Sequence, residues 1–155
     1  MKQRIFFQFC LMSMLLFCGC SFFQSSKPVK TENRTQLFAS IWKPSKAENA
    51  PDTVVMEFSA DGVRITGCAG TNRFFGNCAW EVKDFPLPSQ FSPLEFGMMG
   101  STRMAGPHDD YEAEFLKRMS EVRAYRLSDD GKQLSLFNSR GGLLLNFDRI
   151  SGVGN

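Results

Sequence analysis

The sequence predicts a mainly β domain with one helix, an α+β fold built as an open, barrel-like antiparallel sheet that a single helix covers. Three observations predict this class. Short segments of alternating apolar and polar residues recur in both halves of the chain, turn residues separate these segments, and one amphipathic stretch lies between the halves. An order of strands, one helix and strands favours a single sheet with the helix packed on one side or end.

Four strands are expected before the helix, over residues 36–42, 54–58, 63–68 and 77–82. The second is the clearest, because Val54, Met56 and Phe58 lie on one face of an extended chain. An Ala-Asp-Gly turn at 60–62 joins it to the third strand as a hairpin. Prolines interrupt the segment 86–93, so an edge strand or an irregular crossing is expected there.

The helix is expected to begin near Pro107, with Asp109 and Glu112 as a candidate capping box. Apolar residues then recur at spacings of four, four and three, which predicts a buried stripe and not a partner surface. These residues are Tyr111, Phe115, Met119 and Val122. Three more strands are expected over residues 124–127, 133–137 and 143–147, followed by a disordered tail at 151–155.

The N-terminus has the pattern of a secretory signal. Lys2 and Arg4 precede an uncharged apolar stretch of 13 residues, too short to span a bilayer, which needs about 20. The tetrad Phe-Cys-Gly-Cys at 17–20 reads as a lipobox, so residues 1–19 are expected to be removed and Cys20 to carry the lipid, including an acyl chain such as palmitate. The alternative is a signal peptide that is cleaved without lipidation. Ser21 after the cysteine favours the outer membrane, with the protein on its periplasmic face.

Three regions are expected in the mature chain: a flexible tether at 20–34, a folded domain at 35–150 and the tail. The full chain has 18 Lys and Arg against 16 Asp and Glu, and two of the basic residues belong to the signal. The mature chain is therefore neutral overall, which argues against a nucleic-acid partner.

Two sequence blocks resemble a known family. Residues 67–76, Gly-Cys-Ala-Gly-Thr-Asn-Arg-Phe-Phe-Gly, resemble the "G-x-x-G-C-N-R-F-x-G" loop of META-domain proteins, the family of the heat-shock lipoprotein HslJ. Residues 100–107, Gly-Ser-Thr-Arg-Met-Ala-Gly-Pro, resemble that family's "x-x-T-R-M-A-C-P". The resemblance covers residues 36–149. It implies an association with heat response, drug tolerance and, in some members, secretion or motility, without an agreed biochemical activity.

Both blocks commonly carry a cysteine in the family, and here these positions are Thr71 and Gly106. Cys68 and Cys78, ten residues apart, flank the loop instead, in strands that could be antiparallel neighbours. We expect them to form a disulfide in an oxidising periplasm, the alternative being two free buried thiols.

The candidate interaction loop consists of Asn72, Arg73, Phe74 and, from the second block, Arg103. Its glycines and asparagine suit tight turns, so it can serve either as a binding loop or as a device that closes the barrel. The structural role is the more common one. Arg103 could equally form a salt bridge or clamp a backbone carbonyl.

A reaction centre is not recognisable. His108 is the only histidine, and no nucleophile elbow, phosphate loop or zinc-protease motif is present, so we expect neither an enzyme nor a cofactor. A copper(I) site is a weaker alternative, because thioethers and imidazole suit that ion. Its ligands would be Met98, Met99, Met104 and His108, although methionine is also an ordinary core residue.

The sequence therefore favours a non-catalytic, lipid-anchored envelope protein of the META type. It would act as a stress-related module for protein interaction or envelope maintenance in the periplasm, with another envelope protein as partner. The alternative is a small barrel that binds an apolar ligand such as a lipid, because ten phenylalanines lie in the folded part. Small barrels, however, usually fill their interior with side chains.

Overall fold

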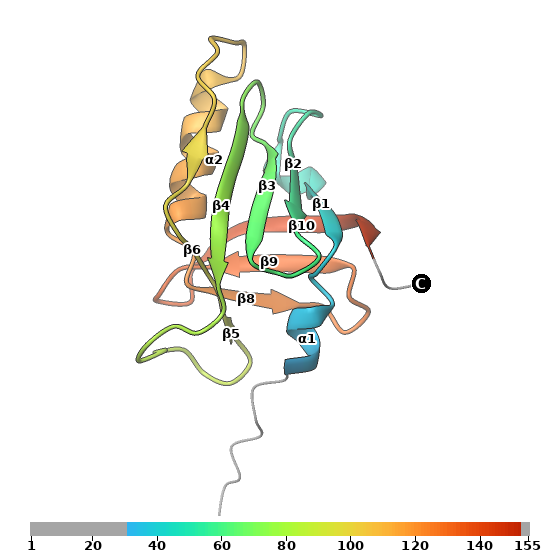
Figure 1. Ribbon diagram of the computed structural model, residues 1–155, viewed down its shortest axis with the longest axis vertical. Coiled ribbons are helices and arrows are strands. Elements are labelled where there is room, and N and C mark those ends of the chain that lie inside the picture. Colours follow the sequence, from blue (N-terminus) through green and yellow to red (C-terminus); the bar gives the residue numbers. More distant parts are fainter. Residues whose placement is uncertain (1–30, 153–155) are drawn as a thin grey trace, which may run out of the picture.

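The computed structural model describes residues 31–152, and its main feature is one open, curled antiparallel sheet (Figure 1). Nine strands follow the order β5-β8-β9-β10-β1-β2-β3-β4-β6, and β7 also pairs with β4. The strands are β1 (Ser40–Pro44), β2 (Val55–Phe58), β3 (Arg64–Cys68), β4 (Arg73–Ala79), β5 (Ser92–Pro93), β6 (Glu95–Phe96), β7 (Gly100–Ser101), β8 (Ala124–Leu127), β9 (Gln133–Phe137) and β10 (Leu143–Gly152). The predicted class, a mainly β domain with a barrel-like sheet and one main helix, is confirmed.

The main helix, α2 (Asp109–Ser120), stands beside β4 and contacts β6 and β10, so it covers one side of the curled sheet (Figure 1). A short helix α1 (Thr31–Thr35) and a single 3-10 turn, η1 (Lys46–Glu48), complete the described part of the chain. Figure 1 places α1 at one end of the molecule and the β3–β4 turn at the other. No helix of the described part is both long and apolar enough to cross a membrane.

The space between α2 and the sheet is filled by aromatic side chains. The ring of Phe115 on α2 lies 5.6 Å from that of Phe74 and 6.4 Å from that of Phe147, measured between centroids. Phe58 and Phe96 pair in the same way at 6.3 Å. Burying such rings is the largest favourable contribution to folding, at roughly 25 cal/mol per Å² of apolar surface. These phenylalanines are therefore core residues and not the wall of a hollow barrel.

Most predicted elements are confirmed, and β2, β3, β8 and β9 match within one residue. Two strands begin elsewhere. The first begins at Ser40 and not at 36, because the chain turns before it: Leu37 N–H donates to Arg34 O, and Ala39 has a positive φ of 49°. The fourth begins at Arg73 and not at 77, so most of the segment predicted as a glycine-rich loop is strand.

The ends of the domain also differ from the prediction. Residues 31–34, expected in the tether, lie in α1. Ser151 and Gly152, expected in the tail, extend β10 and pair with Ile41 and Ser40. Pairing with β1 gives these two residues backbone hydrogen-bond partners that the sequence pattern does not reveal. The predicted signal, Cys20 and residues 153–155 lie outside the described residues.

The helix prediction is confirmed, but its capping box is not. Phe115, Met119 and Val122 are fully buried, as the apolar stripe predicts. His108 is the N-cap and makes no capping side-chain bond. Asp109 instead accepts a hydrogen bond from Gly106 N–H, and Glu112 is bonded to another part of the chain.

The predicted disulfide is wrong, because Cys68 and Cys78 are both free. They do lie in antiparallel neighbours, but at opposite ends of the pair: Cys68 is opposite Arg73, and Cys78 N–H donates to Val63 O. About five residues of strand separate them, or about 17 Å. A disulfide needs Cα atoms within about 7 Å.

Candidate functional site

The two sequence blocks meet at one end of the molecule, where the β3–β4 turn contacts the connection from β7 to α2. We call this meeting point the motif junction and define it by Thr71, Asn72, Thr102, Met104 and Glu112. Two buried polar side chains hold it together, Asn72 at 4% exposure and Glu112 at 6%. Buried polar groups of this kind must find hydrogen-bond partners within the protein.

Asn72 joins the first block to the second through its side-chain amide. Its Oδ1 accepts hydrogen bonds from Thr102 Oγ1 at 2.9 Å and from Met104 N–H at 2.7 Å. Its Nδ2 donates to Met104 O at 2.8 Å. One amide therefore binds both backbone groups of Met104 and fixes the register of the two segments.

Glu112 joins the same turn to α2. Its Oε2 accepts hydrogen bonds from the backbone N–H groups of Thr71, at 3.1 Å, and Asn72, at 2.9 Å. Hydrogen bonds to a charged acceptor are stronger than neutral ones, at about 1.5–3 kcal/mol each. The carboxylate thus replaces the sheet partners that the turn residues lack, and it ties the turn to the helix.

The structure splits the predicted interaction loop into two buried and two exposed residues. Asn72 belongs to the junction, and Phe74 is buried against Phe115. Arg73 and Arg103 are exposed. Asn72 and Phe74 therefore have the structural role, closing one end of the sheet, and do not form a binding loop.

Three exposed apolar side chains along β4 and the connections beside it were missed by the sequence prediction: Phe75 (58% exposed), Met98 (97%) and Met104 (60%). Phe75 could have been found from alternation, because Phe74 and Gly76 face the core and Arg73, Phe75 and Asn77 face outward. The expected loop concealed that signal. Met98 and Met104 lie in irregular backbone, where no periodicity marks an exposed residue.

A shallow depression of about 320 Å³ lies between the second block and the first two turns of α2. Arg103 and Met104 line it on one side, and Ala113 and Leu116 on the other. It contains the polar atoms of the junction, which are already bonded to each other. We find no arrangement of a nucleophile and a base there among the described residues.

Thr71 and Gly106, where the family commonly has cysteines, are in contact. A Cβ placed on Gly106 would lie 2.0 Å from Thr71 Oγ1 and 2.7 Å from Thr71 Cβ. The absence of a Cβ at Gly106 thus makes room for the threonine. The two blocks are close enough at this point for a covalent link with only a small adjustment.

The four copper-ligand candidates do not gather in one place. Met99 lies beside Gly76, its Cγ 3.2 Å from where a Cβ would be. His108 lies beside Gly70, at the end of the hairpin. The stretch of β4 and turn between Asn72 and Gly76 alone spans about 13 Å. Within residues 31–152, no three His, Cys, Asp or Glu side chains form a metal-binding group either.

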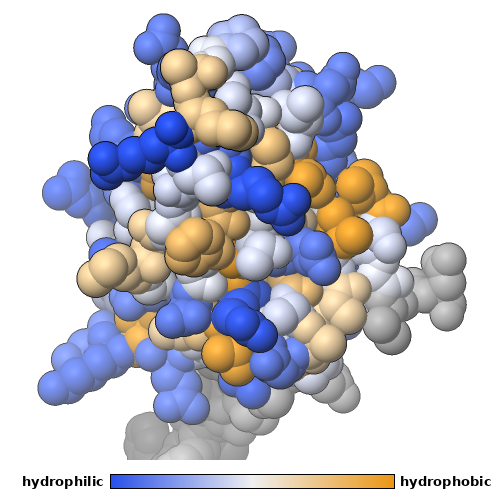
Figure 2. Space-filling model, turned by 45° about the horizontal axis from the view of Figure 1, so that its top comes forward, coloured by the Kyte–Doolittle hydropathy of each residue, from blue (hydrophilic) through white to orange (hydrophobic). Residues whose placement is uncertain are grey.

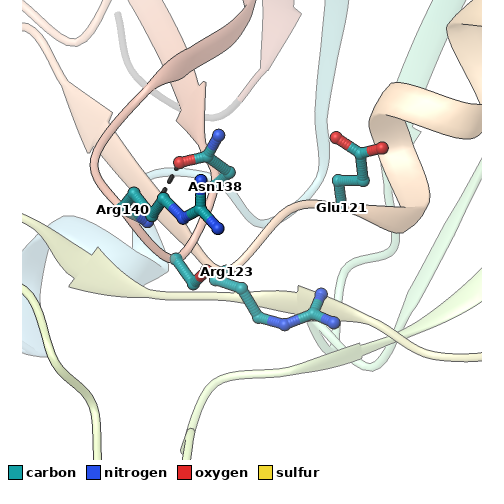
Figure 3. Close-up of a pocket in the computed structure, with 5 residues that line it drawn as sticks. Glu121, Arg123, Asn138 and Arg140 are labelled. Carbon is teal, nitrogen blue, oxygen red and sulfur yellow. Dashed lines mark hydrogen bonds between the residues drawn. The ribbon is translucent and has the colours of Figure 1, made fainter.

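A second depression, of about 340 Å³, lies between the end of α2 and the β9–β10 turn (Figure 3). Arg123 is already engaged there: its Nε lies 3.2 Å from Glu95 Oε1, and its Nη1 donates to Ser120 O and Val122 O. Asn138 holds the turn by accepting from Arg140 N–H at 3.0 Å. Figure 3 shows the guanidinium groups of Arg123 and Arg140 lying apart, so they do not converge on a ligand.

Two partly buried titratable groups that pack against the core have raised pKa values. Burial, together with the charge of Asp61, raises the pKa of Cys78 to about 12. Burial, together with the charge of Glu48, raises the pKa of Tyr111 to about 12. A thiol acts as a nucleophile only as a thiolate. Cys78 is therefore an inert core residue at neutral pH.

Comparisons with known proteins agree with the two blocks. The META domain family model matches residues 35–150. Among solved structures, the chain is similar to a protein from Burkholderia xenovorans determined by NMR, with 24% identity, a TM-score of 0.52, and coverage of 77% of this chain and 88% of that one. It is more distantly similar to a crystal structure of a DUF4847 family protein from Bacteroides vulgatus, with 19% identity, a TM-score of 0.44, and coverage of 66% and 63%. Among curated proteins, no sequence matches the chain. The match over residues 35–150 includes both motif blocks, the helix that follows them and the last strands. It shows that the chain belongs to the META domain family.

Proposed function

We propose that this META-domain protein is a non-catalytic, lipid-anchored component of the cell envelope, acting in interaction or envelope maintenance under stress. The observation that carries the proposal is the motif junction. Its polar side chains are buried and bonded to the protein itself, so the motif builds a rigid end of the molecule. What remains available around that end is a set of exposed arginine and apolar side chains. Surfaces of this composition suit binding better than chemistry.

Cys20 supplies the anchor in this proposal. Its lipid would hold the protein at the outer membrane, on the periplasmic face, and the exposed residues would meet another component of the envelope. The support is the lipobox and the charged and apolar segments before it. The anchor and the folded domain are tested separately, because the anchor lies outside the described residues.

The anchor is tested with Cys20→Ala in cells fed a fatty-acid probe. Labelling should disappear, and the protein should leave the membrane fraction, because one residue carries the whole attachment. Cys18→Ala is the matched control and should keep full labelling, since Cys20 and not Cys18 is the cysteine of the lipobox that takes the lipid. Persistent labelling of Cys20→Ala would show that the attachment site is wrong.

The apolar-ligand alternative finds no specific support. The phenylalanines that would line a hollow barrel, such as Phe58, Phe74 and Phe147, pack against other rings in the core. The copper alternative is likewise weakened by the separation of Met99 from His108. We therefore put forward the envelope module alone.

A further inference from the structure

We propose that the outer face of β3 and β4, with the adjoining second block, docks onto an anionic lipid bilayer. We call it the arginine–apolar face and define it by Arg64, Arg73, Phe75, Met98, Arg103 and Met104. The inference rests on the proposed function in one respect, the nearness of a membrane. It deepens that function by naming the envelope component that the exposed surface meets.

Strand register places the first members of this face together. Arg64 is opposite Asn77, and Phe75 is opposite Thr66, so Arg64 and Phe75 are diagonal neighbours on one surface of the sheet. Arg73 lies two residues before Phe75 and therefore points the same way. All three side chains are exposed.

The second block continues the face along the edge of β4. Gly100 is opposite Phe75, and a Cβ on Gly100 would lie 2.5 Å from the Phe75 ring, so the ring lies over the glycine. Met98 adjoins β4 where Gly97 N–H donates to Asn77 O. Thr102 N–H donates to Arg73 O, which brings the following Arg103 and Met104 to the same end.

Charge is segregated onto this face. The stretches 62–80 and 96–107 contain three arginines and no Asp or Glu, whereas residues 31–152 as a whole carry 14 Lys and Arg against 16 Asp and Glu. Within the described residues, Arg64, Arg73 and Arg103 form no ion pair. Glu57 on β2 lies opposite Thr66 and is the acidic residue that the register places beside this face. Asp61, in the β2–β3 turn, is close enough to interact electrostatically with Arg64, and Asp109 lines the same depression as Arg103. A domain with a small excess of acidic residues thus presents three arginines without a direct ion pair on one side.

Unpaired arginines beside protruding apolar side chains fit a bilayer surface. Basic residues near an anionic leaflet each contribute about 1 kcal/mol, and aromatic and apolar side chains bury themselves at the headgroup boundary. Figure 2, with the β3–β4 end turned forward, shows hydrophobic residues interspersed with strongly hydrophilic ones and no deep groove for a partner chain. A mixed surface of this kind, without a deep groove, matches a lipid headgroup layer better than it matches a shaped protein epitope.

The tether makes this contact geometrically feasible. Eleven residues from Cys20 to the start of α1 span at most about 40 Å. The α1 end and the β3–β4 turn lie at opposite ends of the molecule, and the face runs along the strands between them (Figure 1). A domain tethered at one end can therefore lie flat, with the effective lipid concentration kept high by the anchor.

The test uses unlipidated mature protein, residues 20–155 with Cys20→Ser, so that the anchor contributes nothing. Binding is measured by co-sedimentation with vesicles of phosphatidylglycerol mixed with phosphatidylcholine, and with phosphatidylcholine alone. The protein should bind the anionic vesicles and should be released as the salt rises to about 0.3 M. Absence of binding, or equal binding to both vesicles, overturns the proposal.

Variants assign the binding to this face. Arg64→Gln, Arg73→Gln and Arg103→Gln together should lower the partition coefficient about 100-fold. The matched control, Lys83→Gln with Lys132→Gln and Arg140→Gln, changes the net charge equally at exposed positions elsewhere and should change binding by less than about threefold. Equal loss in both triples would mean binding by net charge and would overturn the proposal.

The apolar part is tested with Phe75→Ser and Met98→Ser, which should weaken binding about tenfold. Leu143→Ser with Ile150→Ser is the control, since both residues are more than half exposed and lie on β10. A photo-crosslinker at Phe75 in cells should capture lipid, and capture of one specific protein instead would overturn the proposal in favour of a protein partner. Failure of the lipid anchor shows in the Cys20 labelling and leaves the vesicle result unchanged, so the two failures are distinguishable.

Discussion

Asn72 has the largest structural role of any single residue in the two motif blocks. It is nearly fully buried, and its amide forms three hydrogen bonds, all to the second block. An amide side chain carries an acceptor and a donor side by side, so that it can bind both the N–H and the C=O of Met104. The asparagine of the motif is thus explained by geometry, without a ligand.

Asn72→Ala should destabilise the domain by about 1–3 kcal/mol, because it removes the partner of Met104 N–H and Met104 O and truncates a buried side chain. Urea unfolding followed by far-UV circular dichroism measures the change. Asn77→Ala is the control, because Asn77 is exposed and is the third outward-facing residue of β4. This variant should lower the free energy of unfolding by less than about 0.5 kcal/mol. A loss of similar size in both variants would show that the network contributes nothing.

Asn72→Asp separates the donor from the acceptor role. The carboxylate still accepts two hydrogen bonds but faces Met104 O with a negative charge, so burial and that carbonyl should raise its pKa in the folded state. The unfolded state then loses the proton first, and stability falls as the pH rises through the folded pKa. Thermal unfolding between pH 4 and 8 should show the variant gaining stability toward acid relative to wild type. Parallel profiles would contradict the assigned donor role.

At the scale of elements, the two blocks act as one unit because α2 and the β3–β4 turn are tied through Glu112. The carboxylate comes from the first turn of the helix and reaches two backbone N–H groups 40 and 41 residues earlier in the chain. The local sequence suggests that Glu112 caps its own helix. In the structure its carboxylate instead accepts hydrogen bonds from the β3–β4 turn. Contacts across such long separations define the fold of a β protein more than local preferences do.

Thr71→Cys with Gly106→Cys should form a disulfide under oxidising conditions, because the two positions are already in contact. Closing a loop of this length should add about 3–4 kcal/mol in the chain-entropy model, less the strain of separating Cβ atoms that start too close. Mass spectrometry before and after reduction, with Cys68 and Cys78 alkylated in both states, measures the bond. Unfolding with and without reductant measures its effect on stability.

Either single variant is the control for that pair. The new thiol of Thr71→Cys alone should stay free. The Cys68 thiol donates a hydrogen bond to Gly70 O, and Cys78 lies at the far end of the hairpin. No disulfide in the double variant, with the fold intact, would mean that the junction holds its two segments farther apart than the contact at Gly106 indicates.

On the scale of the whole molecule, the half-barrel is closed by side chains and not by strand pairing. The sheet ends at short strands, β5 on one side and β6 with β7 on the other. Short, irregular edge strands discourage further pairing with other chains. The helix and its aromatic ring contacts then fill the open side, so the stability of the domain depends on the core around Phe115.

Alkaline pH should unfold this core. The pKa of Cys78 rises from an ordinary value of 9.0 to about 12 through burial, so between these values the unfolded chain loses a proton that the folded protein keeps. Stability should therefore fall as the pH rises above 9, by up to about 1.4 kcal/mol per pH unit for one such group. Thermal unfolding from pH 8 to 11 measures the slope.

Cys78→Ala removes this contribution and should flatten the alkaline slope, even though the smaller side chain lowers stability at every pH. Cys68→Ala is the matched control and should leave the slope unchanged. The slopes and not the absolute stabilities decide, because cavity formation adds a constant cost. An unchanged slope in Cys78→Ala would assign the alkaline loss to other groups, Tyr111 first among them.

Much of the fold could be predicted because the relevant signals are local. Alternation in β2, the apolar stripe of α2 and the turns between the last strands each depend on a few neighbouring residues, and each was found at or near its observed position. Where the prediction was wrong, a distant partner decided the outcome. Ser151 and Gly152 are strand only because β1 lies beside them. Arg73 begins a strand only because it pairs with Cys68 and accepts a hydrogen bond from Thr102 N–H.

The candidate site divides in the same way. By itself, the sequence determined the class of fold, the presence of the two motif blocks, and the residues that make them a META domain. Tertiary structure alone decided that Asn72 and Phe74 point inward, that Arg73 and Phe75 point outward beside Arg64, and that the two cysteines lie at opposite ends of a hairpin. The physical reason is that a strand alternates its two faces, but which face meets the core depends on what packs against it, and here that is a helix some 40 residues away in the chain.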